Sequence, residues 1–249
     1  MPTTCLRSAL LLLAALALAP KLHAQSVEVA SAAAPRLLAP AAHPGRLIVI
    51  GFMGGNVSAG DLRHREALLA QQLQQRDPAR VEAAVFANHD GDKALQTVLR
   101  LLDKDGDGRL SDGEKSAARI VIYGHSWGAS ETVTLARRLD QLGIPVLLTV
   151  QVDSVQKSNE DDRSIPPNVR RAVNFFQARG LIHGRSQIAA MDPTRTTILG
   201  NYESSYRAHP VSCAGYPWFA RTFMRQHIEI ENDPSVWSKI ETLIRAEVG

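Results

Sequence analysis

The hydrophobic pattern of the chain alternates between short apolar runs and amphipathic segments. Residues 47–50 form an apolar, β-branched run, which is typical of a buried strand. The pattern also predicts strands at 81–87, 120–123 and 146–152, and helices at 61–75, 92–102 and 129–142. Strands that alternate with helices indicate βαβ units. We therefore expect an α/β fold with a mostly parallel sheet and helices on both faces.

The pattern is weaker after Asp153. It predicts a helix at 169–177, a strand near 197–201 and a last helix that Asp233 caps, with Pro234 at its first position. The chain has 249 residues, of which 45% are hydrophobic and 21% charged, enough apolar residues for one sizeable core. We place a single folded domain at 46–249.

The N-terminal 45 residues are predicted to precede this domain. Residues 1–24 combine an early Arg7, a short apolar run and a terminal Ala24, which indicates a secretory signal peptide. The run is shorter than the roughly 20 residues that span a bilayer, so we expect no transmembrane span in the mature chain. The alternative is an uncleaved anchor. Residues 25–45 are rich in Ala and Pro and are predicted to be a disordered linker, and the protein to be secreted or periplasmic.

Net charge and cysteine content argue against a nucleic-acid partner and against an intramolecular disulfide. The formal net charge is +3, and removal of Arg7 and Lys21 with the signal peptide leaves +1. We therefore expect no nucleic-acid partner. Cys5 would be lost with the same segment and leave Cys213 alone, so no intramolecular disulfide is expected.

One pentapeptide carries the strongest chemical signal. Gly124-His125-Ser126-Trp127-Gly128 stands between a predicted strand and a predicted helix, as the G-x-S-x-G nucleophile turn requires. Its glycines are needed because the strained turn brings the strand and the helix close together. A serine nucleophile needs a histidine that takes its proton, an acid that orients the histidine, and N–H donors for the oxyanion. The alternative is a chance match to a short pattern.

The context of this pentapeptide resembles the α/β-hydrolase superfamily. The resemblance extends from residue 46 to the C-terminus and includes the preceding strand, which ends in Gly51-Phe52-Met53-Gly54-Gly55. It implies the chain order serine, acid, histidine, with the histidine in a loop before the final helix. His227 is the expected base, with His209 as its rival.

The resemblance implies the remaining site residues less directly. Asp153, at the end of the strand after the serine helix, is the expected acid, and Asp192 is the later alternative. The oxyanion hole is expected to use the backbone N–H groups of Trp127 and Phe52, with Met53 as second choice for the latter. Residues 216–219 are aromatic-rich and either line an acyl pocket or pack under a long loop.

Residues 103–114 match the spacing of an EF-hand-type calcium loop, inserted before the nucleophile strand. The expected ligands are Asp103, Asp105, Asp107, the Arg109 carbonyl, Ser111 and Glu114. Sensor EF-hands normally occur in pairs, so a single loop indicates a structural Ca²⁺. The alternative is an acidic surface loop.

Together these features predict an exported serine hydrolase of lipase or carboxylesterase type. It would cleave a small-molecule or lipid acyl ester, or a thioester, through an acyl-enzyme, with Ca²⁺ as a structural ion and no organic cofactor. An acyltransferase or peptidase with the same triad is also compatible. The alternative from another class is a non-catalytic calcium-binding protein on a hydrolase fold. Neither acyl-chain preference nor oligomeric state is predicted.

Overall fold

The computed structural model describes residues 45–248 of the chain. The predicted signal peptide, residues 1–24, and the predicted linker, residues 25–45 apart from Gly45, lie outside the described residues. In the described part, no helix is both long and apolar enough to cross a bilayer.

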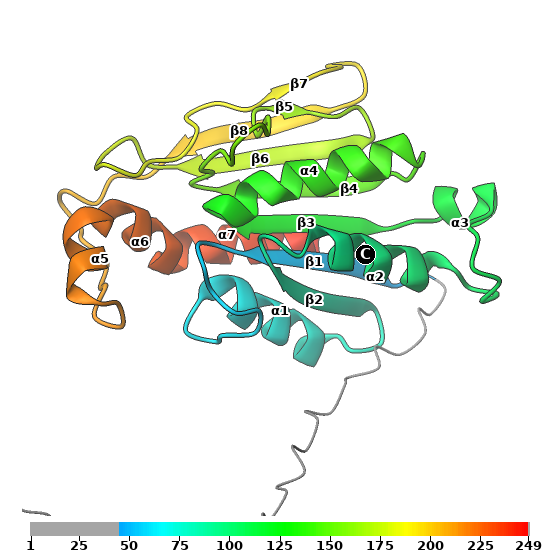
Figure 1. Ribbon diagram of the computed structural model, residues 1–249, viewed down its shortest axis with the longest axis horizontal. Coiled ribbons are helices and arrows are strands. Elements are labelled where there is room, and N and C mark those ends of the chain that lie inside the picture. The colour runs from blue at the N-terminus through cyan, green and yellow to red at the C-terminus, as the bar shows by residue number, and fades with distance from the viewer. Residues whose placement is uncertain (1–44, 249) are drawn as a thin grey trace, which may run out of the picture. The chain divides into compact units, whose positions relative to one another are not determined.

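Six strands form one fully parallel sheet in the order β2–β1–β3–β4–β6–β8 (Figure 1). They are β1 Leu47–Met53, β2 Val81–Ala87, β3 Ile120–His125, β4 Val146–Val152, β6 Val169–Phe176 and β8 Thr197–Glu203. Two short strands, β5 Ser164–Ile165 and β7 Ala189–Ala190, form a separate parallel pair.

Helices cover both faces of the sheet. The helices on the faces are α1 Arg65–Arg76, α2 Gly91–Leu102, α4 Trp127–Gln141 and α7 Pro234–Arg245. The structure also contains the short helices α3 Asp112–Ser116, α5 Trp218–Phe223 and α6 Arg225–Asn232. Alternate residues of a strand point to opposite faces. In β1, Ile48 and Ile50 pack with α2 and α4, whereas Leu47 and Val49 pack with α1 and α7. The predicted α/β class is therefore confirmed, and this sheet order, with the serine turn after β3, is the α/β-hydrolase fold.

The prediction of a helix at 169–177 is wrong, because these residues form β6. Its apolar positions are spaced so that they also fit a helix, but β6 lies inside the sheet between β4 and β8. Ala172 packs into the core under α4, and Val173 packs into the core on the opposite face. A strand buried on both faces is apolar almost throughout, so periodicity does not separate it from a buried helix.

The other predicted elements are present: β2 and β4 have the predicted bounds, and the ends of the rest are shifted. β1 continues to Met53, three residues beyond its predicted end, because the added residues are buried and all pair with β2, and Gly51 and Phe52 also pair with β3. Asp233 caps α7 by accepting a hydrogen bond from the Ser235 N–H at 2.8 Å, and Pro234 is the first helical residue, as predicted.

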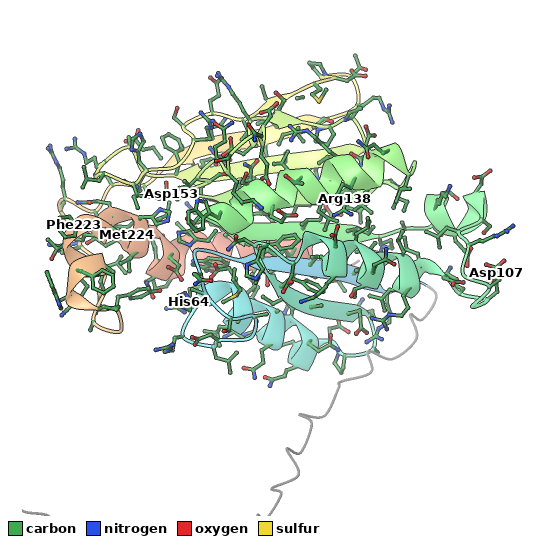
Figure 2. All side chains as sticks on the ribbon, viewed as in Figure 1. His64, Asp107, Arg138, Asp153, Phe223 and Met224 are labelled. Carbon is green, nitrogen blue, oxygen red and sulfur yellow. The ribbon has the colours of Figure 1, made fainter. Side chains whose placement is uncertain are left out.

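Because all six strands are parallel, their carboxyl ends meet at one edge of the sheet. In open parallel sheets, ligand sites form at this edge. Figure 2 shows Asp153 and His64 toward this edge, and Asp107 beyond the opposite end of the sheet. The two groups of predicted site residues therefore lie at opposite ends of the molecule's central sheet.

Candidate active site

The serine predicted as nucleophile sits in a strained turn between β3 and α4. Ser126 has φ 57° and ψ −124°, a backbone conformation that costs energy for a residue with a Cβ. A Cβ added to Gly124 would lie 2.4 Å from the Gly128 carbonyl oxygen, and one added to Gly128 would lie 2.3 Å from the Phe52 carbonyl oxygen. Only glycine fits both positions, so the local sequence accounts for the turn.

Three side chains form a continuous hydrogen-bonded chain at the edge of the sheet. Ser126 Oγ lies 2.8 Å from His227 Nε2, and His227 Nδ1 lies 2.6 Å from Asp153 Oδ2. Only 7% of Ser126, 2% of His227 and none of Asp153 is exposed. This order of contacts is the one that nucleophile, base and acid adopt in serine hydrolases.

Asp153 is fixed by several donors besides His227. It follows β4, with φ 44°, and its Oδ1 accepts hydrogen bonds from the N–H groups of Gln177 at 3.1 Å and Gly184 at 2.7 Å. The Gln177 side chain donates to Oδ2 at 2.8 Å. A Cβ on Gly184 would lie 2.4 Å from the Asp153 backbone. The loop after β6 therefore clamps the carboxylate in the orientation that the histidine needs.

The rival residues lie elsewhere. Asp192 is partly exposed, and its side chain accepts hydrogen bonds from the backbone N–H and the hydroxyl of Thr194, as the turn alternative predicted. His209 is exposed. His227, in turn, belongs to the first turn of α6 and not to the loop that the resemblance implied.

A second histidine stacks against His227. The ring centroids of His125 and His227 are 4.5 Å apart, and their planes are tilted by 34°. Burial lowers the pKa of His125 to about 4, so its ring is neutral at physiological pH. It therefore adds no positive charge against the imidazolium that His227 forms when it takes a proton.

Ser126 and His227 open into a cleft of about 620 Å³. Its apolar wall comes from α5, α6 and the segment before them: Tyr216, Pro217, Phe219, Ala220, Met224 and Ile228. Three of the residues 216–219 thus line the cleft, and Trp218 is 70% exposed. The alternative that this segment simply packs under a loop is wrong.

The predicted oxyanion donors differ in their placement. Trp127 is the first residue of α4, where backbone N–H groups have no acceptor within the helix. Phe52 is fully buried inside β1, opposite Gly124 of β3, and does not line the cleft, and Met53 is buried in the same strand. Residues 54–57 follow β1 and do line it. β1 is longer than predicted, so both predicted donors lie within the strand and not in the loop after it.

The predicted calcium loop lies between α2 and β3. Carboxylate oxygens of Asp103, Asp105 and Glu114 lie within 4.8 Å of one another. Gly106 and Gly108 have φ of 71° and 78°, which allows the tight turn. This donor set fits a hard cation such as Ca²⁺, which takes six to eight oxygens.

The other predicted ligands of this loop are arranged as follows. The Asp107 carboxylate accepts the N–H of Arg109 at 2.7 Å and is not part of the carboxylate group above. Ser111 and Glu114 form a capping box at the start of α3, in which the Ser111 hydroxyl donates to Glu114 Oε2 at 2.8 Å. The Glu114 carboxylate is therefore held in place by hydrogen bonds at the start of α3.

Three polar residues beside His125 were not predicted from the sequence: His64, Glu66 and Glu231. Glu66 offered a signal, because it precedes Leu69 and Leu73 at helical spacing and so occupies the apolar face of α1. Glu66 is fully buried and Glu231 is 4% exposed.

No model of a known protein family matches the chain, and no curated protein is significantly similar to it. Solved structures that are similar to this chain include an esterase from Rhizomucor miehei, which is 20% identical over 46% of this chain and 36% of that one, with a TM-score of 0.30. A thermostable esterase from Pseudomonas putida is 9% identical over 82% and 76%, with a TM-score of 0.42. A thioesterase of prodiginine biosynthesis from Streptomyces coelicolor is 11% identical over 85% and 96%, with a TM-score of 0.39. The chain thus spans little more than a third of the Rhizomucor protein, and likenesses of this size identify no shared substrate.

Proposed function

We propose that this protein is a serine hydrolase that cleaves an ester or thioester through an acyl-enzyme. The observation that carries the proposal is the hydrogen-bonded chain from Ser126 through His227 to Asp153, built on a strained turn that only glycines permit. Backbone strain of this kind persists where the surrounding fold enforces it, and the strained turn places the Ser126 hydroxyl at the start of a helix, facing the cleft.

In the first step, Ser126 Oγ attacks the carbonyl carbon while its proton passes to His227 Nε2. The Asp153 carboxylate holds the ring through Nδ1 and stabilises the imidazolium that forms. The tetrahedral intermediate then collapses, the bond from carbon to the leaving oxygen or sulfur breaks, and His227 Nε2 returns the proton to the leaving group. The acyl group stays on Ser126.

In the second step, water attacks the acyl carbon and gives a proton to His227 Nε2. The bond to Ser126 Oγ breaks, the serine takes back the proton, and the carboxylic acid leaves. The oxyanion of both steps is held by the Trp127 N–H at the start of α4 and by a backbone N–H of residues 55–57, since the Gly54 N–H already donates to Glu66. This segment replaces the predicted Phe52 because it lines the cleft.

The cleft favours an acyl ester with an apolar part. Its wall includes Tyr216, Phe219 and Met224, and its volume is within the range of small-molecule sites. A lipase or carboxylesterase substrate, either a small molecule or a lipid, fits this lining.

The proposal includes one structural Ca²⁺ and export. The loop 103–114 holds the ion through the carboxylates of Asp103, Asp105, Asp107 and Glu114, the Arg109 carbonyl and Ser111. Support comes from the spacing of the acids and the grouping of three carboxylates. The ion lies away from the triad and stabilises the segment that leads into β3. The signal-like residues 1–24 support a secreted or periplasmic protein.

Labelling with a fluorophosphonate probe tests the proposal. The probe reacts with an activated serine, so we expect labelling of the wild-type protein, none of Ser126→Ala and at most a trace of His227→Ala. Ser116→Ala, an exposed serine of α3, is the control and should label normally. If the folded wild-type protein stays unlabelled with and without Ca²⁺, the hydrolase proposal fails and a non-catalytic calcium-binding protein becomes the better account.

A further inference from the structure

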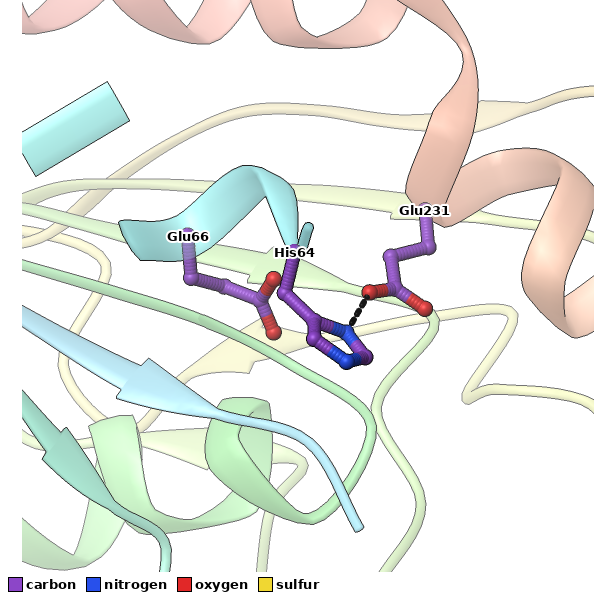
Figure 3. A group of neighbouring side chains, drawn as sticks. All are labelled: His64, Glu66 and Glu231. Atoms are coloured by element: carbon purple, nitrogen blue, oxygen red, sulfur yellow. Dashed lines mark hydrogen bonds and ion pairs between the residues drawn. The ribbon is translucent and has the colours of Figure 1, made fainter. Parts of the chain in front are cut away.

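A compact polar cluster lies beside His125, behind the proposed catalytic histidine. It consists of His64, Glu66 and Glu231, and one ligand atom of each lies within 4.8 Å of the others. His64 precedes α1, Glu66 is in its first turn, and Glu231 comes from α6 (Figure 3). Both carboxylates point toward the His64 ring in Figure 3, and His64 and Glu231, which are 167 residues apart in the chain, are in contact.

The cluster holds more negative charge than the neighbouring groups balance. Within residues 45–248, the basic groups found within 4.0 Å of the two carboxylates are all histidines, and one of them, His125, is neutral. His64 Nδ1 lies 2.5 Å from Glu231 Oε1, and His125 Nδ1 lies 3.8 Å from Glu66 Oε1 and 3.7 Å from Glu231 Oε2. Two buried carboxylates that face each other without a lysine or arginine are costly unless a cation or a proton joins them.

Glu66 provides an independent indication of a missing partner. Its Oε1 accepts the N–H of Gly54 at 3.1 Å, whereas its Oε2 has no hydrogen-bond partner although the residue is fully buried. The Nε2 atom of His125 is unpartnered as well. Buried polar atoms nearly always have a partner, so an unpaired carboxylate oxygen inside such a cluster is the position that a bound cation would fill.

We propose that His64, Glu66 and Glu231 bind a divalent transition-metal ion, with zinc as the best fit and His125 as the nearest further ligand. Two carboxylates and a divalent ion make a neutral site. Zinc takes imidazole nitrogen and carboxylate oxygen at about 2.0–2.2 Å, which places tetrahedral ligand atoms about 3.3–3.6 Å apart. The distances from His125 Nδ1 to both carboxylates are close to this spacing.

The ligand chemistry separates this site from the loop 103–114. Nitrogen ligands suit zinc and its neighbours, whereas Ca²⁺ takes oxygens alone. The ion has an entry path, because His64 and Glu231 line the same cleft as Ser126. Bound there, it would tie the start of α1 to α6, the helix that carries His227. Metal binding is independent of the proposed hydrolase activity and is measured without it.

A zinc titration of the purified protein against a chromophoric chelator, with Ca²⁺ in excess, tests the site. We expect one tightly bound Zn²⁺ per chain in the wild-type protein. Glu66→Gln and Glu231→Gln keep the size and one acceptor oxygen of each side chain, and each should weaken zinc binding at least about tenfold. Glu229→Gln is the matched control: it is a buried carboxylate of α6 that pairs with Arg225 outside the cluster, and it should bind zinc normally.

Two further measurements do not depend on whether the variants fold. Co²⁺ added to the wild-type protein should give the strong visible absorption of a four- or five-coordinate nitrogen and oxygen site, and Zn²⁺ should raise the thermal midpoint. Ser126→Ala should bind zinc normally, which separates this result from the proposed function. Absence of both zinc binding and the Co²⁺ absorption in the wild-type protein would overturn the proposal. Unchanged zinc affinity in folded Glu66→Gln and Glu231→Gln would overturn it too.

Discussion

The two ends of the parallel sheet are built in opposite ways. At the carboxyl edge, polar side chains from β3, β4, α1 and α6 converge, and they are buried. At the opposite end, the acids of residues 103–114 follow one another along the chain and are mostly exposed. The first site exists only when the whole sheet is assembled, whereas the second is encoded within twelve consecutive residues.

The carboxylates at the two ends also differ in their electrostatics. Burial raises the pKa of Glu66 to about 8, from its ordinary 4.5. Backbone N–H groups of Lys104 and Ser111, together with the Ser111 hydroxyl, lower the pKa of Glu114 to about 2. Loss of water therefore governs the charge of Glu66, and local hydrogen bonds govern that of Glu114.

The largest expected difference between the two ends is in catalysis. Asp153→Asn keeps the shape of the side chain but removes the charge that orients and stabilises His227, so kcat should fall by about 10²–10⁴-fold. Asp192→Asn, the matched change in the rejected acid, should leave kcat and KM unchanged, since Asp192 only holds a turn with Thr194. Ester hydrolysis under steady-state conditions measures both. Equal losses in the two variants would refute the assignment of the acid.

Adding one methyl group at each end should affect stability in opposite ways. In Gly128→Ala, the new Cβ meets backbone atoms at 2.3 Å, which cannot move without shifting β1, so we expect a loss of roughly 3 kcal/mol. In Gly113→Ala, the nearest atom is 3.9 Å away and the residue is helical, so the protein should be unchanged or stabilised by up to about 1 kcal/mol. Urea unfolding checks both, and a stable Gly128→Ala would show that the turn is not as tight as described.

Calcium should affect stability and spare catalysis. At a hundredfold excess over its dissociation constant, a bound ion adds about 2.7 kcal/mol. For a domain of this size that raises the thermal midpoint by about 5–10 °C. Asp103→Asn should abolish the shift, whereas Asp112→Asn, inside the loop but outside the predicted ligands, should retain it. Turnover below both midpoints should be the same with Ca²⁺ or with a chelator, and a loss of turnover in the chelator would contradict a purely structural ion.

The smallest effect is on the pH dependence of stability. Glu131 lies in α4 and pairs with Lys157, and burial raises its pKa. Its contribution to the free energy of unfolding is therefore fully present below the ordinary pKa of 4.5 and is lost as the pH rises. Glu114 has a lowered pKa, so its contribution is present above 4.5 and is lost as the pH falls toward 2. Thermal midpoints in chelator should therefore change slope in opposite directions in Glu131→Gln and Glu114→Gln. The same change in both variants would contradict the contrast.

The sequence predicted those features whose signal is local. The strand before Ser126, the flanking glycines and the spacing of the loop acids can each be recognised in a short stretch of sequence. In a parallel sheet, Asp153 then lies at the same edge as Ser126, because each follows the carboxyl end of its strand. Strand β6 was predicted as a helix because both its faces are buried. The convergence of His64 and Glu231 had no sequence signal, since only the packing of α1 and α6 brings them together.

The most direct test of the account is to find the acyl-enzyme. The protein would be mixed with an ester of a slowly released acyl group, quenched with acid, and analysed by intact mass and by peptide mapping. The account predicts one acyl group per chain, on the peptide that contains Ser126, and none in Ser126→Ala. No adduct on a folded protein that hydrolyses the ester, or an adduct on another residue, would contradict it.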